Sequence, residues 1–192
     1  MIYILEGLDC AGKTVRANLL NNYFISIGKK IKVYREPGGS AVGEELRKIL
    51  KSDMSFSDIT AAYLFATSRM QNLSEIIENY DEDCIYIFDR SFISSLVYQG
   101  DYAEKINSYY IEQLNKLDYT IIFIDIDYSE FLKRKNNRVD SDRFEDSLTE
   151  SIFNSYRDKY KKIIEKYNYI VIQQNDDIIE KIKEQKKNQW IF

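Results

Sequence analysis

"GLDCAGKT", residues 7–14, fits the pattern G-x-x-x-x-G-K-[ST] and is the most informative stretch of this sequence. It follows an apolar run, "IYILE" at 2–6, and it precedes a segment, 14–27, whose apolar residues recur with a helical period. An isolated match to this pattern would be an ordinary turn, whereas a match between a strand and a helix is the context in which it binds phosphate.

Four residues of this loop have side-chain or backbone properties that suit a nucleotide. Gly7 and Gly12 let the backbone wrap around a phosphate, and the amides at the helix N-terminus point at it. Lys13 can reach the β- and γ-phosphates, and the Thr14 hydroxyl can ligate Mg²⁺. The loop therefore predicts a nucleoside triphosphate site. Its expected ATP-binding residues are Gly7, Leu8, Asp9, Cys10, Ala11, Gly12, Lys13 and Thr14.

The rest of the chain alternates short apolar runs with longer segments of helical periodicity. This pattern is typical of a parallel sheet covered by helices on both faces, and 192 residues without a linker or repeat predict one domain, 1–192. The expected strands are 2–6, 31–35, 84–88, 119–126 and 168–173. The expected helices are 14–27, 42–51, 57–79, 104–117 and 144–166.

The first of these helices has an apolar stripe along one side. Val15, Leu19, Tyr23 and Phe24 fall on one helical stripe and are expected to face the sheet. Gly28 follows at the position where a left-handed C-cap is common.

Composition argues against several classes of function. The formal net charge of −4 disfavours a general nucleic-acid surface, so a polyanionic ligand must meet a local basic cluster. Cys10 and Cys84 lack metal-type spacing and favour reduced thiols. Histidine is absent, so the chemistry works without imidazole. The first residues contain no leader pattern and no 18-residue apolar run occurs, so we expect a soluble, cytoplasmic protein without membrane or nucleic-acid partners.

Polar residues follow two further strands at their carboxyl ends, where an open parallel sheet binds its ligands. The stretch Arg35–Ser40, "REPGGS", follows the second strand. Pro37 forces Glu36 into an extended conformation, and the two glycines of the stretch permit positive φ. Asp89 and Arg90 follow the third strand. Asp89 could hold Mg²⁺ or could instead cap a helix over 91–98, and Arg90 could grip a second phosphate.

Three other groups could serve either ligand binding or packing. Phe65 and Arg69 are four apart and share one helix face, where a ring and a guanidinium could stack a base and read its edge. Ser95 and Tyr98 belong to a similar cluster in "RSFISSLVYQG". The arginine-rich stretch 134–145 could be a nucleotide-covering lid or a solvated loop.

These pieces together resemble the thymidylate kinase family, over about residues 1–160. "EGLDCAGKT" looks like the family's phosphate loop, "REPGGS" with "GEELR" (43–47) like its second-strand segment, and "FATSR" like its base-stacking helix. "DRSFISSLVYQG" and the spacing of Arg138 to "R-x-E" are similar to its later motifs, and "SYRDKY" (155–160) resembles the segment after the lid.

The resemblance implies a three-layer α/β P-loop NTPase fold with a five-stranded parallel sheet of order 2-3-1-4-5 and a short lid. It also implies ATP-dependent phosphorylation of dTMP to dTDP with Mg²⁺, usually by a homodimer. Thr14 and Asp89 would then serve the metal. The substrate-binding residues that it implies are Arg35, Glu36, Arg47, Phe65, Arg69, Arg90, Ser95, Tyr98 and Gln99.

Within that set the resemblance implies distinct roles. Phe65 would stack on thymine, Arg69 with Ser95 would hydrogen-bond its edge, and Tyr98 would lie under the sugar and disfavour a 2′-hydroxyl. Arg35 and Arg90 would hold the acceptor phosphate.

The catalytic residues that the resemblance implies are Asp9, Lys13, Arg90, Arg138 and Arg143. Asp9 would contact the 3′-hydroxyl or order the metal. Because the variable loop positions 8–11 carry no basic residue, the catalytic arginine is expected in the lid, at Arg138 and Arg143.

Two positions depart from the family pattern. Ser91 stands where a bulky residue is common, and Val97 where a small one is usual, which leaves fine base specificity open. The resemblance further suggests that the Glu36–Pro37 peptide is cis, against a base rate of about 5–6%.

Two alternative functions remain at this point. A deoxynucleoside kinase of related fold would phosphorylate a 5′-hydroxyl with Glu36 as base. A regulatory GTPase is suggested by "NKLD" (115–118), but that motif precedes a strand instead of following one, which favours an accidental helix end.

Overall fold

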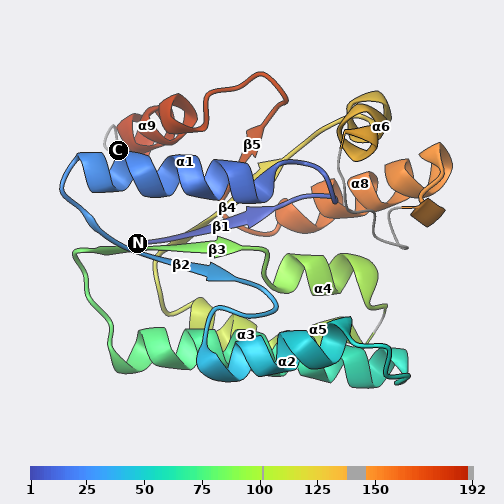
Figure 1. The fold of residues 1–192 in the computed structure, drawn as a ribbon. Helices are drawn as coiled ribbons and strands as arrows, with labels where there is room; N and C mark the ends of the chain where they lie inside the picture. The colour runs from blue at the N-terminus through green and yellow to red at the C-terminus, as the bar shows by residue number, and fades with distance from the viewer. Residues whose placement is uncertain (101, 138–145, 190–192) are drawn as a thin grey trace.

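A computed structural model describes residues 1–100, 102–137 and 146–189 of the chain. Five parallel strands form one sheet in the order β2-β3-β1-β4-β5, as predicted. The strands are β1 (Ile2–Glu6), β2 (Lys30–Arg35), β3 (Cys84–Asp89), β4 (Tyr119–Ile124) and β5 (Tyr169–Ile172). Their arrows point the same way in Figure 1, so their carboxyl ends share one edge of the sheet.

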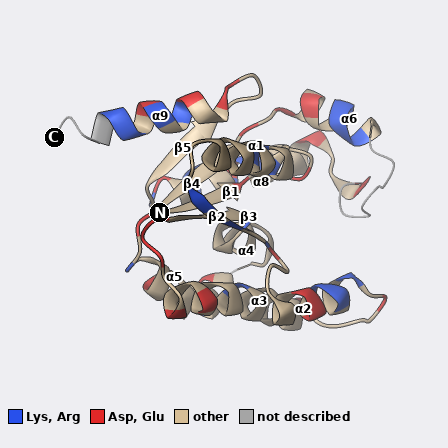
Figure 2. Ribbon diagram, turned by 60° about the vertical axis from the view of Figure 1, so that its left-hand side comes forward, with Lys and Arg blue, Asp and Glu red and all other residues tan. Residues whose placement is uncertain are grey.

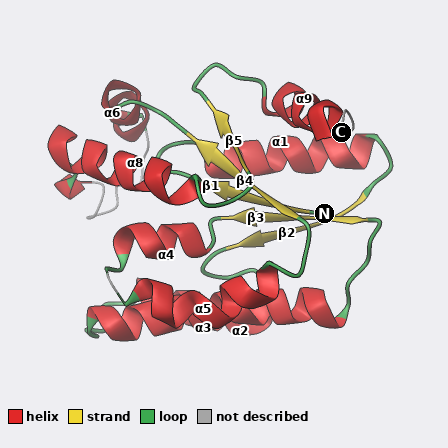
Figure 3. Ribbon diagram, turned by 180° about the vertical axis from the view of Figure 1, so that it is seen from behind, coloured by secondary structure: helices red, strands yellow, loops and turns green. Residues whose placement is uncertain are grey.

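Helices cover both faces of this sheet, which confirms the three-layer fold (Figures 1 and 3). One layer contains α1 and α9, and the opposite layer contains α2, α3 and α5. α4, α6 and α8 lie toward the carboxyl ends of the strands. The helices are α1 (Lys13–Ser26), α2 (Ala41–Lys51), α3 (Asp58–Glu78), α4 (Phe92–Tyr98), α5 (Ala103–Leu114), α6 (Tyr128–Asn136), α8 (Glu150–Ile164) and α9 (Ile178–Gln189).

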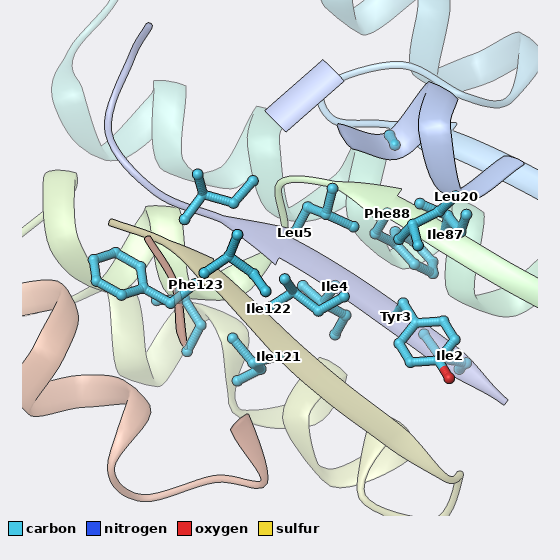
Figure 4. Close-up of a cluster of buried hydrophobic side chains, with 14 of the residues drawn as sticks. Ile2, Tyr3, Ile4, Leu5, Leu20, Ile87, Phe88, Ile121, Ile122 and Phe123 are labelled. Carbon is cyan, nitrogen blue, oxygen red and sulfur yellow. The ribbon is translucent and has the colours of Figure 1, made fainter. Parts of the chain in front are cut away.

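The three central strands form the core. Every residue of β1 and β3 is buried, as expected for parallel strands covered on both faces. Figure 4 shows side chains from these strands, β4 and α1 packed together. The labelled members are Ile2, Tyr3, Ile4, Leu5, Leu20, Ile87, Phe88, Ile121, Ile122 and Phe123. By contrast, β2 is an edge strand with mostly exposed side chains.

The predicted buried stripe of the first helix was partly wrong. Val15 and Leu19 are 64% and 48% exposed, whereas Ala17, Leu20 and Phe24 are buried. The buried residues of α1 follow Lys13 at intervals of three and four residues, and they are Arg16, Ala17, Leu20 and Phe24. Val15 and Leu19 lie on the opposite side of the helix and therefore face outward. Gly28 has φ +77°, so the predicted left-handed helix end is confirmed.

The other element boundaries differ from the predictions by a few residues. The predicted helix 104–117 ends at Leu114, so "NKLD" lies in the turn between α5 and β4 instead of forming the end of the helix, and it precedes a strand as the sequence indicated. The predicted strand 119–126 ends at Ile124, and α8 begins at Glu150. The single-domain extent, 1–192, stays a prediction.

Charge is unevenly distributed over the helices, with basic residues conspicuous on α6 and α9 (Figure 2). The last turn of α6 contains Lys133, Arg134 and Lys135, so the first residues of the predicted lid, 134–145, belong to this helix. Within the described ranges, no helix combines the length and apolarity that crossing a membrane requires.

Candidate active site

The loop between β1 and α1 has the backbone that its glycines predict. Gly7 has φ +146°, and a Cβ there would lie 2.6 Å from the Ile124 carbonyl oxygen, so only glycine fits. Gly12, the N-cap of α1, is left-handed at φ +87°. Leu8 and Ala11 are buried in the core, so this loop can offer a ligand only the backbone at those two positions.

Lys13 lies inside this loop rather than in solvent. It is 7% exposed, and its Nζ donates to the carbonyl oxygens of Gly7 at 3.0 Å and Leu8 at 2.7 Å. Burial, with the nearby Arg90 charge, lowers the pKa of Lys13 to about 8, although Asp9 and Asp89 oppose the shift. A buried ammonium without a full counter-charge is suited to an incoming anion.

Thr14 and Asp89 meet across the sheet edge, because the Thr14 hydroxyl donates to Asp89 Oδ2 at 2.5 Å. These are the hard oxygen ligands that Mg²⁺ prefers, and Mg²⁺ usually takes only one or two protein ligands beside phosphates and water. The pair therefore fits a magnesium site. The alternative that Asp89 caps α4 was wrong, since the amides of Ser91 and Ser94 donate to Glu6 at 2.8 and 3.3 Å.

Arg90 is held in a left-handed conformation, φ +74°, which a non-glycine residue rarely adopts. Its guanidinium is paired with the Asp9 carboxylate and donates to the Gly7 carbonyl at 3.1 Å and to Ser94 Oγ at 3.0 Å. Burial alone would lower the pKa of Arg90, but Asp9 and the nearby Tyr160, Tyr98 and Glu6 together outweigh burial and raise the pKa. This arginine is therefore charged and fixed beside the loop.

The "REPGGS" turn carries the chain from β2 to α2. The Glu36–Pro37 peptide is cis, as predicted, and Gly38 and Gly39 have φ of +123° and +89°. Arg47 Nη1 donates to the Pro37 carbonyl at 2.7 Å, and this contact joins the middle of α2 to the turn. The turn thus directs Arg35 and Arg47 toward the same side of the sheet edge.

Arg69 was expected to read a base, and it lies in a buried polar cluster. Its Nε donates to Glu36 Oε2 at 2.7 Å, and both side chains are 3% exposed. Burial raises the pKa of Glu36 to about 7, even though the Arg69 charge opposes this. Glu36 Oε1 has no hydrogen-bond partner among the described residues.

One cleft of about 1230 Å³ joins these parts at the carboxyl ends of β1, β2 and β3. It contains both the loop and the predicted acceptor side. The predicted residues that line it are Asp9, Cys10, Gly12, Lys13, Thr14, Arg35, Glu36, Arg47, Phe65, Arg69, Asp89, Arg90, Ser95, Tyr98 and Gln99. Arg138 and Arg143 lie outside the described residues.

Sequence reasoning missed two residues of the site, Arg16 and Glu6, and it placed Arg134 only within the possible lid, 134–145. Arg16 and Arg134 line the cleft, and both donate to the Ala11 carbonyl, at 3.2 and 2.8 Å. The Lys13-to-Arg16 spacing of one helical turn could have indicated Arg16. Glu6 is fully buried, and burial raises its pKa despite a 2.6 Å hydrogen bond from Ser94 Oγ. Its position directly before Gly7 was the available signal.

A phosphate-binding loop after the first strand of a parallel sheet of this order, with a basic cleft at the strand ends, defines a P-loop nucleotide-binding protein. A family model described as thymidylate kinase matches residues 5–185. The thymidylate kinase of Thermoanaerobacter pseudethanolicus is 36% identical over 171 residues, which is 84% of this chain and 82% of the relative.

Two further relatives extend over more of the chain. The thymidylate kinase of Sulfurihydrogenibium sp. is 33% identical over 186 residues, 91% of this chain and 89% of the relative. The probable thymidylate kinase of Methanobrevibacter smithii is 30% identical over 177 residues, 90% and 85% respectively. This chain belongs to the thymidylate kinase family and is a phosphoryl-transferring enzyme.

Proposed function

We propose that this protein transfers the γ-phosphoryl group of ATP to the 5′-phosphate of dTMP, which yields dTDP and ADP for deoxynucleotide synthesis. The observation that carries the proposal is the single cleft in which the phosphate loop faces a second set of arginines, Arg35, Arg47 and Arg90. Planar guanidinium groups suit phosphate oxygens, so this arrangement supports a phosphorylated acceptor opposite the donor.

The part of the cleft formed by the phosphate loop binds the triphosphate of ATP, the phosphoryl donor. The loop amides and Lys13 bind its β- and γ-phosphates, and Lys13 exchanges its two loop carbonyls for phosphate oxygens. Thr14 and Asp89 would hold Mg²⁺, which when bound neutralises charge on those phosphates. Asp9 keeps Arg90 in place from the same loop, which ties the donor site to the acceptor site.

The acceptor half positions dTMP. Arg35 and Arg90 hold its phosphate, with Arg47 from α2 beside them. Phe65 stacks on the base, while Tyr98 lies under the sugar. Further contacts to the acceptor are assigned to Glu36, Arg69, Ser95 and Gln99.

The reaction needs positioning and charge neutralisation more than a proton shuttle, because the acceptor phosphate is already an anionic nucleophile. An oxygen of dTMP bonds to the γ-phosphorus as the bond to the β,γ-bridging oxygen breaks, and ADP leaves with those electrons. No imidazole is required, which suits a chain without histidine. Arg138 and Arg143, in the proposed lid at 134–145, are assigned to the charge of the transferring group.

A coupled kinase assay across the nucleoside monophosphates with ATP tests the function, and dTMP is expected to be the preferred acceptor. Thymine differs from uracil by one methyl group, worth about 1–3 kcal/mol in an apolar pocket, so weaker turnover of dUMP is expected. Arg138→Ala is expected to lower turnover by about 10³-fold or more. Unchanged turnover of that variant would contradict the lid assignment.

The second candidate, a deoxynucleoside kinase, needs Glu36 as a base beside a 5′-hydroxyl. The Arg69 ion pair already engages Glu36, which favours the monophosphate kinase. Turnover of thymidine but not of dTMP in a paired assay would reverse this choice. A GTP-specific switch, the least supported candidate, would bind GTP without kinase activity.

We further infer a homodimer in the cytoplasm, on the family resemblance. Apolar side chains on the outer face of α3, among them Ile59 at 46% and Tyr63 at 57% exposure, support a partner surface there. Sedimentation equilibrium is expected to give twice the chain mass of 22.8 kDa. A monomer at micromolar concentration would contradict this inference.

A further inference from the structure

The Arg69 guanidinium is held by three acceptors that come from three different parts of the chain. Nε donates to Glu36 Oε2 at 2.7 Å, Nη1 to Asn107 Oδ1 at 2.5 Å, and Nη2 to the Ser91 carbonyl at 3.2 Å. Arg69 is only 2% exposed, yet it lines the cleft. Each of its nitrogens is therefore fixed in direction by one acceptor.

Asn107 is itself oriented by its own helix. Its Nδ2 donates to the Ala103 carbonyl at 2.8 Å, so its Oδ1 is the end that faces Arg69. Asn107 is fully buried in α5 and does not line the cleft. It acts on a ligand only through Arg69.

Tyr110, one turn further along α5, supports the same guanidinium. Its ring centroid lies 5.7 Å from Arg69 Cζ, and its hydroxyl is 2.8 Å from Ser91 Oγ. A large ring from α5 thus packs beside the small Ser91, whose carbonyl accepts from Arg69. Three hydrogen-bond acceptors and one aromatic ring therefore hold this arginine.

The chemistry of this enclosure limits what Arg69 can recognise. A guanidinium has five N–H donors and no acceptor, and three donors are used by Glu36, Asn107 and Ser91. No other acceptor within the described residues takes the remaining two. A base edge at Arg69 must therefore offer a hydrogen-bond acceptor, such as a ring carbonyl, and an amino group there would leave buried donors unpaired.

We propose that Asn107 is a specificity-determining positioning residue, which fixes Arg69 so that the acceptor nucleotide must present a carbonyl where cytosine presents an amino group. This inference rests on the proposed function and extends it from the residues that touch the substrate to one that does not.

The test compares Asn107→Ala with wild type by steady-state kinetics on dTMP and dCMP. The KM for dTMP is expected to rise about tenfold or more, the factor for one hydrogen bond to a charged group, with kcat within about threefold. The ratio of kcat/KM for dTMP over dCMP is expected to fall by a similar factor. The KM for ATP is expected to stay unchanged, which a general structural defect would not allow.

Two further variants make the result specific. Asn107→Asp keeps an oxygen acceptor toward Arg69 and is expected to restore the dTMP preference. Ser108→Ala, an exposed neighbour on the same helix, is the matched control and is expected to behave as wild type. If Asn107→Ala melts below the assay temperature, Asn107→Ser is measured instead.

The outcomes separate this inference from the proposed function. An unchanged dTMP-to-dCMP ratio in a folded Asn107 variant, with an active wild type, overturns the inference alone. An equal loss on every substrate, ATP included, also overturns it and indicates a structural role. A wild-type protein that phosphorylates no monophosphate overturns both.

Discussion

Lys13 should lose its charge in the free enzyme at mildly alkaline pH, and this makes capture of ATP dependent on pH. The pKa falls from 10.5 to about 8 on burial in the loop, which corresponds to about 3 kcal/mol of cost for charging this lysine before a ligand arrives. A lowered lysine pKa means that the charged form is lost as the pH rises through about 8. At about pH 9, roughly one tenth of the free enzyme keeps the ammonium.

The expected result is a decline of kcat/KM for ATP above about pH 8, approaching a factor of ten per pH unit. At saturating ATP the phosphates surround Lys13 and raise its pKa, so kcat is expected to stay flat to about pH 9.5. The assay is the coupled kinase reaction at saturating dTMP, with ATP varied at each pH.

Lys13→Arg supplies the control, because a guanidinium does not titrate in this range. Its activity is expected to be low but its kcat/KM profile flat. A wild-type profile that does not fall between about pH 7.5 and 9.5, or a variant that falls in parallel with it, would refute the reasoning.

Three more perturbations test other parts of the structure. Asp89→Asn removes one hard oxygen ligand and is expected to raise the Mg²⁺ concentration for half-maximal activity about tenfold, whereas an unchanged Mg²⁺ titration would contradict the assignment. Gly7→Ala forces a Cβ to 2.6 Å from the Ile124 carbonyl, so urea unfolding should show a loss of about 1–3 kcal/mol, and wild-type stability would count against the strain. Burial tends to raise the pKa of Asp125, but hydrogen bonds and charges from Arg157, at 2.5 and 2.9 Å, and Lys161, at 3.2 Å, together outweigh burial and lower the pKa. The stability that this carboxylate contributes is therefore lost as the pH falls below about 4. Asp125→Asn is expected to remove that part of the acid dependence, and identical acid midpoints would argue against it.

The features of the site that depend on local spacing in the sequence could be predicted. The phosphate loop and the gathering of the strand-end arginines in one cleft are confirmed, because motif and strand order determine where each Cα lies. The cis peptide before Pro37 is also confirmed, but it was predicted from the family resemblance and not from spacing. Phe65 and Arg69 line that cleft for the same reason, since four residues on a helix make one turn.

The partners of those side chains could not be predicted. The contacts of Arg69 join residues 33, 38 and 22 positions away, and no periodicity indicates which carboxylate or amide will meet a buried guanidinium. The predicted burial of Val15 and Leu19 was wrong for a related reason. Apolar residues occur on more than one face of α1, and only packing against the sheet determines which face is buried.

The contact of Glu6 with α4 has a consequence for how the chain folds. α4 has only seven residues, its N-cap Ser91 makes no side-chain capping bond, and the acceptor for its first amides lies 85 residues earlier on β1. A helix of this length is unstable in isolation. We therefore expect α4 to form only after β1 and β3 have paired. Loss of this late contact should speed unfolding while leaving the folding rate nearly unchanged. The segment that holds Arg90 would then be among the last to become ordered and the first to open.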